Sequence, residues 1–264
     1  MKLFRVVVLT IMCIVILLPL YELFGNAFFI SWRFPNLFPS DFSIDNIKFV
    51  LDNNKYVEAI MNSLKLTFTV TMLSMILGFF AAKTLGTMKF RGSKFIEIYM
   101  LLPSLTSNVS FLYGLRYVLI KYNLYLTYES LIFVQLISCL PYSIMLMIPV
   151  FKNYDMDIER QASTLGSGWF NTLIYVTLPA VKSGVAVAFM YTFMVSWAMF
   201  LAMSFFAPVG FYTIATLLVP LIQDSTDYNL IASLTVMFIL PAILIFVLTA
   251  KNIGNSKADG GKMI

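Results

Sequence analysis

Residues 157–179, DIERQASTLGSGWFNTLIYVTLP, separate two long apolar runs and decide how the chain is organised. Acidic residues near the start favour the positive end of a helix, and residues 158–165 suffice for about two turns. Gly166 then suits a left-handed C-terminal stop, because glycine adopts positive φ without steric cost. Ser167 is expected to cap a second short helix, and Pro179 suits the first turn of the next one. The segment therefore predicts two short helices joined by a turn at a membrane surface.

The second short helix is expected to carry an apolar face. Trp169, Leu173 and Val176 share one side at helical spacing, and Phe170 and Ile174 lie beside them. Large apolar side chains on a polar loop indicate a surface that a partner or the bilayer covers. The alternative is an amphipathic loop that packs on its own helix bundle.

The composition indicates a polytopic membrane protein of the all-α class. Of 264 residues, 60% are hydrophobic and 12% charged, and the mean hydropathy is +0.86. Cys13 and Cys139 lie in separate apolar runs, which predicts no disulfide framework, and histidine is absent. We therefore expect no metal site, and the net charge of +5 indicates membrane topology rather than nucleic-acid binding.

The apolar runs predict six transmembrane helices, with a cytoplasmic loop between the fourth and fifth. They are residues 6–21, 64–82, 95–118, 131–151, 181–206 and 228–250. Pro103 is expected to kink the third span, and Pro141 lies in the middle of the fourth. The run 211–223 is too short to cross a bilayer and is interpreted as a re-entrant or outer-surface helix. Residues 42–53 are expected to form a short interfacial helix.

The basic residues predict the orientation. With both termini and the loop 152–180 inside, twelve lysines and arginines lie on the cytoplasmic side and six outside. The expected organisation is a first span with an external segment at 1–56, a transmembrane domain at 57–250 and a cytoplasmic tail at 251–264.

The sequence contains no enzyme motif that we can identify. Paired intramembrane carboxylates, a zinc-protease HExxH, a nucleophile elbow and a Walker A sequence are all absent, so the chain is expected not to be an enzyme. Scarce intramembrane charge argues against ion-coupled carriers, although a self-sufficient secondary carrier or channel stays as the alternative function.

Polar residues within the spans are candidates for a translocation path. The candidates are Ser104, Ser107, Asn108, Gln135, Tyr142, Tyr191, Ser196 and Trp197. For each of them, the alternative is a hydrogen bond between packed helices.

The loop resembles the EAA loop of type I ABC importer permeases. That pattern is Glu-Ala-Ala, three residues, Gly, nine residues, an aliphatic, any residue and Leu-Pro. Ala162, Gly166, Val176 and the pair at 178–179 match it in identity and spacing. The sequence departs at the first two positions, 160–161, which are Arg and Gln, and a glutamate lies one residue earlier.

The resemblance implies partners and site residues. It implies a five-helix core paired with a second permease subunit, a cytoplasmic ABC ATPase dimer that binds ATP and Mg, and an extracytoplasmic substrate-binding protein, in a bacterial cytoplasmic membrane. No cofactor is expected in this chain. The implied ATPase-coupling residues are Glu159, Arg160, Ala162, Gly166, Trp169, Phe170, Leu173, Leu178 and Pro179. The external segment 32–39 looks like that of subgroups importing polyamines, iron, thiamine or aminoethylphosphonate.

Overall fold

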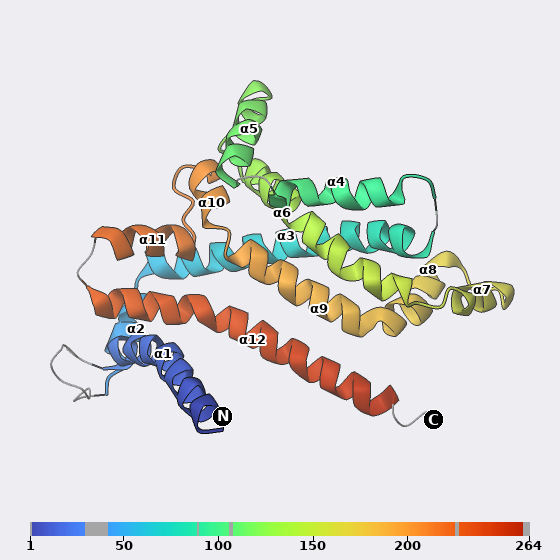
Figure 1. Cartoon of the computed structure of the whole chain (residues 1–264). Helices are drawn as coiled ribbons and strands as arrows, with labels where there is room; N and C mark the ends of the chain where they lie inside the picture. The colour runs from blue at the N-terminus through green and yellow to red at the C-terminus, as the bar shows by residue number, and fades with distance from the viewer. Residues whose placement is uncertain (1, 30–41, 89, 106–107, 225–226, 261–264) are drawn as a thin grey trace. The chain divides into compact units, whose positions relative to one another are not determined.

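The computed structural model describes residues 2–29, 42–88, 90–105, 108–224 and 227–260 (Figure 1). Within these ranges the chain is helical, apart from turns and one isolated bridge between Phe29 and Phe42. The predicted all-α class is therefore confirmed. The segment 32–39, which suggested an import subgroup, lies outside the described residues.

Five helices of the described residues are long and apolar enough to cross a membrane. They include α1 (Lys2–Phe28), α3 (Asn54–Thr87), α6 (Tyr128–Lys152), the helical run Trp169–Trp197 and α12 (Tyr228–Gly260). Two short helices match the expectations for non-spanning segments, namely α2 (Asp45–Asp52) and α11 (Ile214–Asp224). Because α12 continues to Gly260, most of the predicted polar tail is helical.

The third predicted span is two helices rather than one kinked helix. α4 (Ser93–Leu105) and α5 (Asn108–Lys121) point in different directions, and neither has the length of a span (Figure 1). Pro103 lacks a backbone donor, and small hydroxyl residues follow it in the sequence. Residues 106–107 lie outside the described residues, and the predicted third span is not confirmed as one continuous helix.

The fifth predicted span also ends earlier than expected. α9 (Leu178–Trp197) stops at Ala198, and α10 (Phe200–Phe206) begins after Met199. α10 packs on α5 and α6 and buries Ala202, Met203 and Phe206. Neither proline nor glycine lies at the break, and the apolar face of α10 is buried after it.

The chain divides into two compact units. Unit 1 comprises residues 1–62 and 212–243, and unit 2 comprises residues 63–211 and 244–264. The core of unit 1 contains Val50, Leu218 and Leu234. The core of unit 2 is larger and lies between α3, α6, α9 and the helices packed on them.

Small residues bring the helices of unit 2 close together. A Cβ at Gly86 of α3 would lie 2.7 Å from Phe151 Cβ of α6, and one at Gly184 of α9 would overlap Val150 of α6. Ser143 Oγ of α6 also donates to the carbonyl of Ser74 in α3 at 2.9 Å. Close backbone approach favours van der Waals packing in lipid, where no hydrophobic effect drives association. The closely packed helices of unit 2 therefore hold both ends of the loop between α6 and α9.

Candidate functional site

The loop between α6 and α9 contains α7 (Asp157–Thr164), which ends in a Schellman motif. Gly166 has φ +87°, its N–H donates to the Ser163 carbonyl at 3.0 Å, and the Ser167 N–H donates to the Ala162 carbonyl at 3.0 Å. These two bonds satisfy carbonyls that the end of α7 would otherwise leave free. The predicted left-handed stop at Gly166 is confirmed.

The second short helix, α8 (Trp169–Thr172), begins differently from the prediction. Gly168 occupies the N-cap position, and no side chain caps the helix. Ser167 Oγ instead accepts a hydrogen bond from Thr172 Oγ1 at 3.0 Å. The prediction that Ser167 caps α8 is wrong, because its backbone N–H closes the turn after α7 and Gly168 takes the cap position.

α8 continues into the fifth span without a break. A π-helical segment, η1 (Leu173–Thr177), joins α8 to α9, and the Leu178 N–H donates to the Leu173 carbonyl five residues earlier. Pro179 lies in the first turn of α9, and its ring would clash with the carbonyl four residues before it in a regular α-helix. The wider turn accommodates the proline. α8, η1 and the fifth span, α9, thus form one continuous helical segment.

A half-buried ion pair fixes α7 to the bundle. Lys83 Nζ of α3 donates to both carboxylate oxygens of Glu159 at 2.8 Å, and Thr177 Oγ1 of η1 donates to Glu159 Oε1 at 2.5 Å. The two charged side chains are only 19% and 14% exposed. Burial opposes ionisation of Glu159, but the hydrogen bonds from Lys83 and Thr177 and the charge of Lys83 outweigh it and lower the pKa of Glu159. The carboxylate therefore stays ionised and joins three helical elements.

Arg160 points away from this contact. Its guanidinium pairs with Asp157 in the same turn of α7 at 2.8 Å, and both side chains are well exposed. An exposed pair of this kind contributes only about 0–1 kcal/mol. Glu159, rather than the residue at position 160, thus contacts the bundle.

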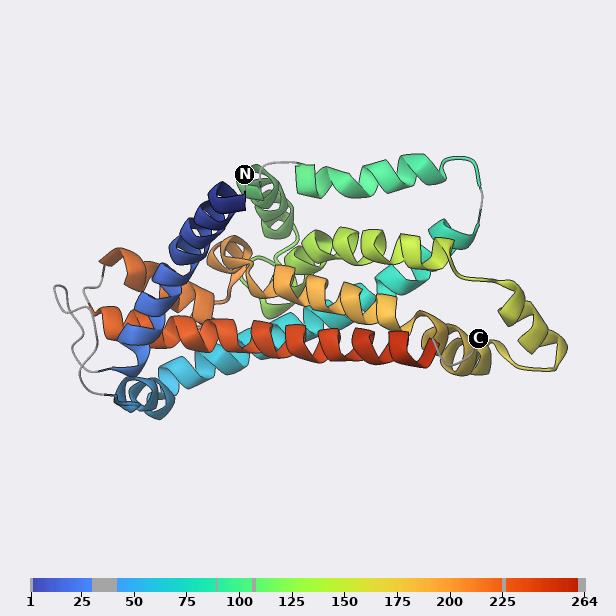
Figure 2. The same ribbon diagram turned by 60° about the horizontal axis from the view of Figure 1, so that its bottom comes forward.

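Several large apolar side chains of the loop are exposed, and three of them lie at the turn between α7 and α8 and in α8 itself. Leu165 is 88% exposed, Trp169 67% and Phe170 63%, and we call these three the exposed loop face. Both views show α7 and α8 beyond the ends of α6 and α9 (Figures 1 and 2). Leu173, predicted to share this face, packs instead on the core of unit 2. Trp169 also stacks on Phe80, with ring centroids 6.1 Å apart.

The polar residues of the spans divide into two groups. Ser196 Oγ donates to Gln135 Oε1 at 3.0 Å, both side chains are fully buried, and Trp197 is buried beside Phe193. Tyr142 and Tyr191 instead form a ring pair at 5.8 Å, and Tyr191 is 43% exposed. The two tyrosines are thus the members that reach the surface of α6 and α9.

The remaining path candidates lie in the broken third span. Ser104 belongs to α4 and Asn108 begins α5, whereas Ser107 lies outside the described residues.

Comparison with known proteins decides the family. The family model for binding-protein-dependent transport system inner membrane components matches residues 74–250, which is most of the chain. The chain belongs to this permease family. The predicted membership of the type I ABC importer permeases is therefore confirmed.

Relatives and solved structures extend the likeness over nearly the whole permease. The spermidine/putrescine transport system permease protein PotC of Escherichia coli (strain K12) is 20% identical over 89% of this chain and 86% of its own length. A bacterial ABC transporter involved in alginate import has a chain with a TM-score of 0.73 at 18% identity, covering 95% of both chains. A second structure, of a bacterial alginate ABC transporter with an alginate-bound periplasmic protein, has a TM-score of 0.68 at 14% identity, covering 94% of this chain and 92% of the other.

Three residues at the permease loop were not predicted from the sequence, namely Lys83 of α3, Thr177 of η1 and Leu165. Lys83 is 76 residues from Glu159 in the chain, and no local pattern connects them. The role of Thr177 depends on the π-helical segment, which has no sequence signal that we recognise. Leu165 could have been predicted, since an apolar residue directly before a helix-stop glycine is a visible feature of the sequence.

Proposed function

We propose that this permease couples to a separate ATPase through its cytoplasmic loop, with the exposed loop face as the docking surface. The observation that carries the proposal is the exposure of Leu165, Trp169 and Phe170 on a loop that Glu159 ties to the bundle. Apolar groups of this size are covered in a working complex. ATP and Mg would be bound by the partner, since the chain contains no Walker A sequence.

The geometry supports rigid transmission of movement. Closure of an ATPase pair would displace α7 and α8 together. α8 is continuous with the fifth span through η1, and Glu159 links α7 to Lys83 in α3. A displacement of the loop would therefore reach two spans as a rigid body.

The proposed assembly also contains a second permease subunit and an extracytoplasmic substrate-binding protein. The family description and the alginate transporter solved with its periplasmic protein support the latter. For the substrate we propose a small polar solute such as a polyamine, iron, thiamine or aminoethylphosphonate. The polyamine permease among the relatives supports this class, whereas the alginate structures show that the fold also serves an acidic polysaccharide.

Labelling from outside tests the proposed orientation, with both termini and the loop in the cytoplasm of a bacterial cell. With Cys13 and Cys139 replaced, Ser167→Cys should be shielded from an impermeant thiol reagent in intact cells, and Asp45→Cys should react. Opening the cells should expose Ser167→Cys to the reagent. Reaction of Ser167→Cys in intact cells would reverse the orientation and refute docking of a cytoplasmic ATPase.

Replacement of Gly166 should uncouple the loop. Gly166→Val places a β-branched residue at φ +87°, which costs about 1–2 kcal/mol or more, and should reduce transport and ATPase stimulation while membrane insertion stays normal. Gly168→Val is the matched control, because Gly168 has φ −68° and neither glycine has a heavy atom within 4 Å of an added Cβ. Equal transport by both variants would show that the Schellman turn does not matter for coupling.

A further inference from the structure

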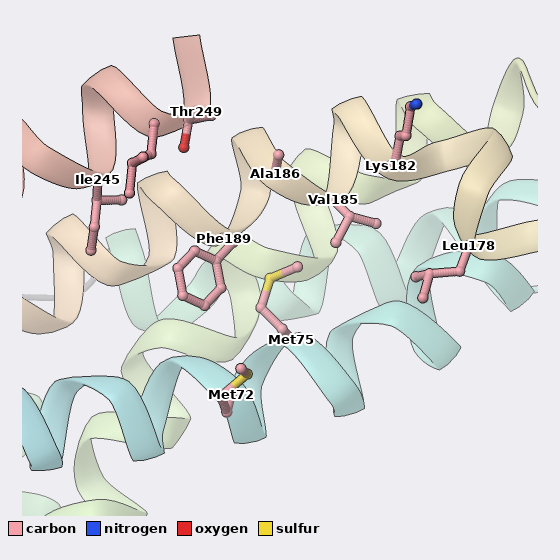
Figure 3. Close-up of a pocket in the computed structure, with 10 residues that line it drawn as sticks. Met72, Met75, Leu178, Lys182, Val185, Ala186, Phe189, Ile245 and Thr249 are labelled. Carbon is pink, nitrogen blue, oxygen red and sulfur yellow. The ribbon is translucent and has the colours of Figure 1, made fainter. Parts of the chain in front are cut away.

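A cavity of about 470 Å³ lies between α3, α9 and α12 within unit 2 (Figure 3). All three helices contribute to its apolar wall, which includes Met72, Val185, Phe189 and Ile245. Its volume is within the range of about 300–1,000 Å³ that is typical of ligand pockets. The cavity is thus large enough for a ligand and offers that ligand an almost wholly apolar surface.

The polar members of the lining lie toward the loop ends of their helices. Lys182 is in the second turn of α9, close to the loop, and Thr249 is two residues before Lys251 of α12. In the orientation proposed above, Lys182 lies near the cytoplasmic end of α9, and Thr249 lies near the cytoplasmic end of the predicted span 228–250. The cavity therefore has a basic rim at the cytoplasmic surface and an apolar interior at membrane depth.

Lys182 is exposed and belongs to none of the ion pairs of the described residues. Basic pockets between transmembrane helices on the cytoplasmic side bind anionic lipid head groups. A lysine at this depth directs its ammonium to the interface while its stem follows apolar surface. The charge and the lining thus complement the two parts of an anionic lipid.

The cavity is separate from the exposed tyrosine pair. Phe189 lines the cavity, and Tyr191, two residues further along α9, stacks with Tyr142 of α6. Residues two apart lie about 200° apart around a helix, at 3.6 residues per turn. The side of α9 that faces the cavity is therefore opposite the side that carries Tyr191.

We propose that this cavity binds one acyl chain of an anionic phospholipid of the cytoplasmic leaflet, with the lipid phosphate at Lys182. The inference rests on the orientation in the proposed function but not on ATPase docking. An acyl chain fits the aliphatic lining, and a lipid phosphate supplies the negative charge that Lys182 lacks.

Native mass spectrometry of the complete importer, titrated with phosphatidylglycerol and phosphatidylcholine, tests this proposal. Wild type should retain phosphatidylglycerol about fivefold better, the value expected for one lysine near a membrane surface. Lys182→Ala should abolish the preference, and Ala186→Phe, which fills the cavity from α9, should reduce retention of both lipids. Lys94→Ala is the control, since Lys94 is an exposed lysine of α4 outside the cavity and should leave the preference unchanged.

Three results would overturn the proposal. One is equal lipid retention by wild type and Ala186→Phe. Another is displacement of phosphatidylglycerol by soluble glycerol phosphate, which would indicate a site for a free anion. The third is efficient cross-linking of Ala186→Cys to the second permease subunit, which would assign the cavity to a subunit interface. These measurements report lipid retention and subunit cross-linking rather than ATPase binding to the loop, so failure here is distinguishable from failure of the docking proposal.

Discussion

Glu159→Lys is expected to abolish ATP-dependent transport while the permease still inserts into the membrane. The change replaces the carboxylate that accepts from Lys83 and Thr177 by a second ammonium beside Lys83. Hydrogen bonds to charged groups contribute about 1.5–3 kcal/mol each, and this ion pair is largely shielded from water. A loss of this size reduces the fraction of molecules in which α7 contacts the bundle by a factor of about ten or more. The measurement is substrate uptake in vesicles at equal permease levels.

A charge-reversed double variant tests whether the ion pair itself causes the effect. The double variant Lys83→Glu/Glu159→Lys restores opposite charges between α3 and α7 and should recover a substantial part of the transport. Arg160→Ala removes only the exposed pair with Asp157 and should transport nearly as well as wild type. If Glu159→Lys transports normally, or if the double variant is no better than the single one, the ion pair does not hold the loop for coupling.

The same contact has a defined pH dependence. Because the folded protein lowers the pKa of Glu159 below its ordinary value of 4.5, the ionised form stabilises the contact of α7 with the bundle above that value. The contribution is lost as the pH falls through the lower, folded-state pKa. The protection factors of the α7 amides, which are corrected for the intrinsic pH dependence of hydrogen exchange, should therefore stay constant from neutral pH down to about 5, because Glu159 remains ionised over that range.

The local features of the loop were predictable because short-range chemistry fixes them. Only glycine adopts positive φ at low cost, so the stop at Gly166 follows from its position after two helical turns. The placement of Pro179 in the first turn of α9 follows in the same way from its missing backbone donor. Amphipathic spacing also identified Trp169 and Phe170, the two aromatic residues of α8, and both are exposed.

Features that depend on packing between distant segments were not predictable. Lys83 and Glu159 meet only because α3 and the loop lie at the same end of unit 2. The fifth predicted span is interrupted at Ala198, where the sequence has no proline or glycine that would predict the end of a helix. The apolar face of α10, with Met203 and Phe206, is buried after this interruption. Leu173 shares the helical spacing of Trp169, yet it packs inward.

Phe170→Ala and Trp169→Ala are expected to weaken association with the ATPase at least roughly tenfold. Aromatic groups that fill a partner's pocket dominate binding, and truncation typically costs about 2 kcal/mol or more, where about 1.4 kcal/mol corresponds to a factor of ten. Phe170 is the cleaner of the two tests, because Trp169 also stacks on Phe80 of its own chain. Tyr117→Ala on α5 is the matched control, since it removes an aromatic side chain that is 74% exposed outside the loop.

The decisive measurement is recovery of the ATPase with the detergent-solubilised permease, compared at equal permease levels for wild type, Phe170→Ala, Trp169→Ala and Tyr117→Ala. The recovered partner must be identified by mass spectrometry as a protein with a Walker A sequence. Wild type and Tyr117→Ala should retain the ATPase, and both loop variants should lose most of it. Undiminished recovery with both loop variants would place the docking surface elsewhere and contradict the account.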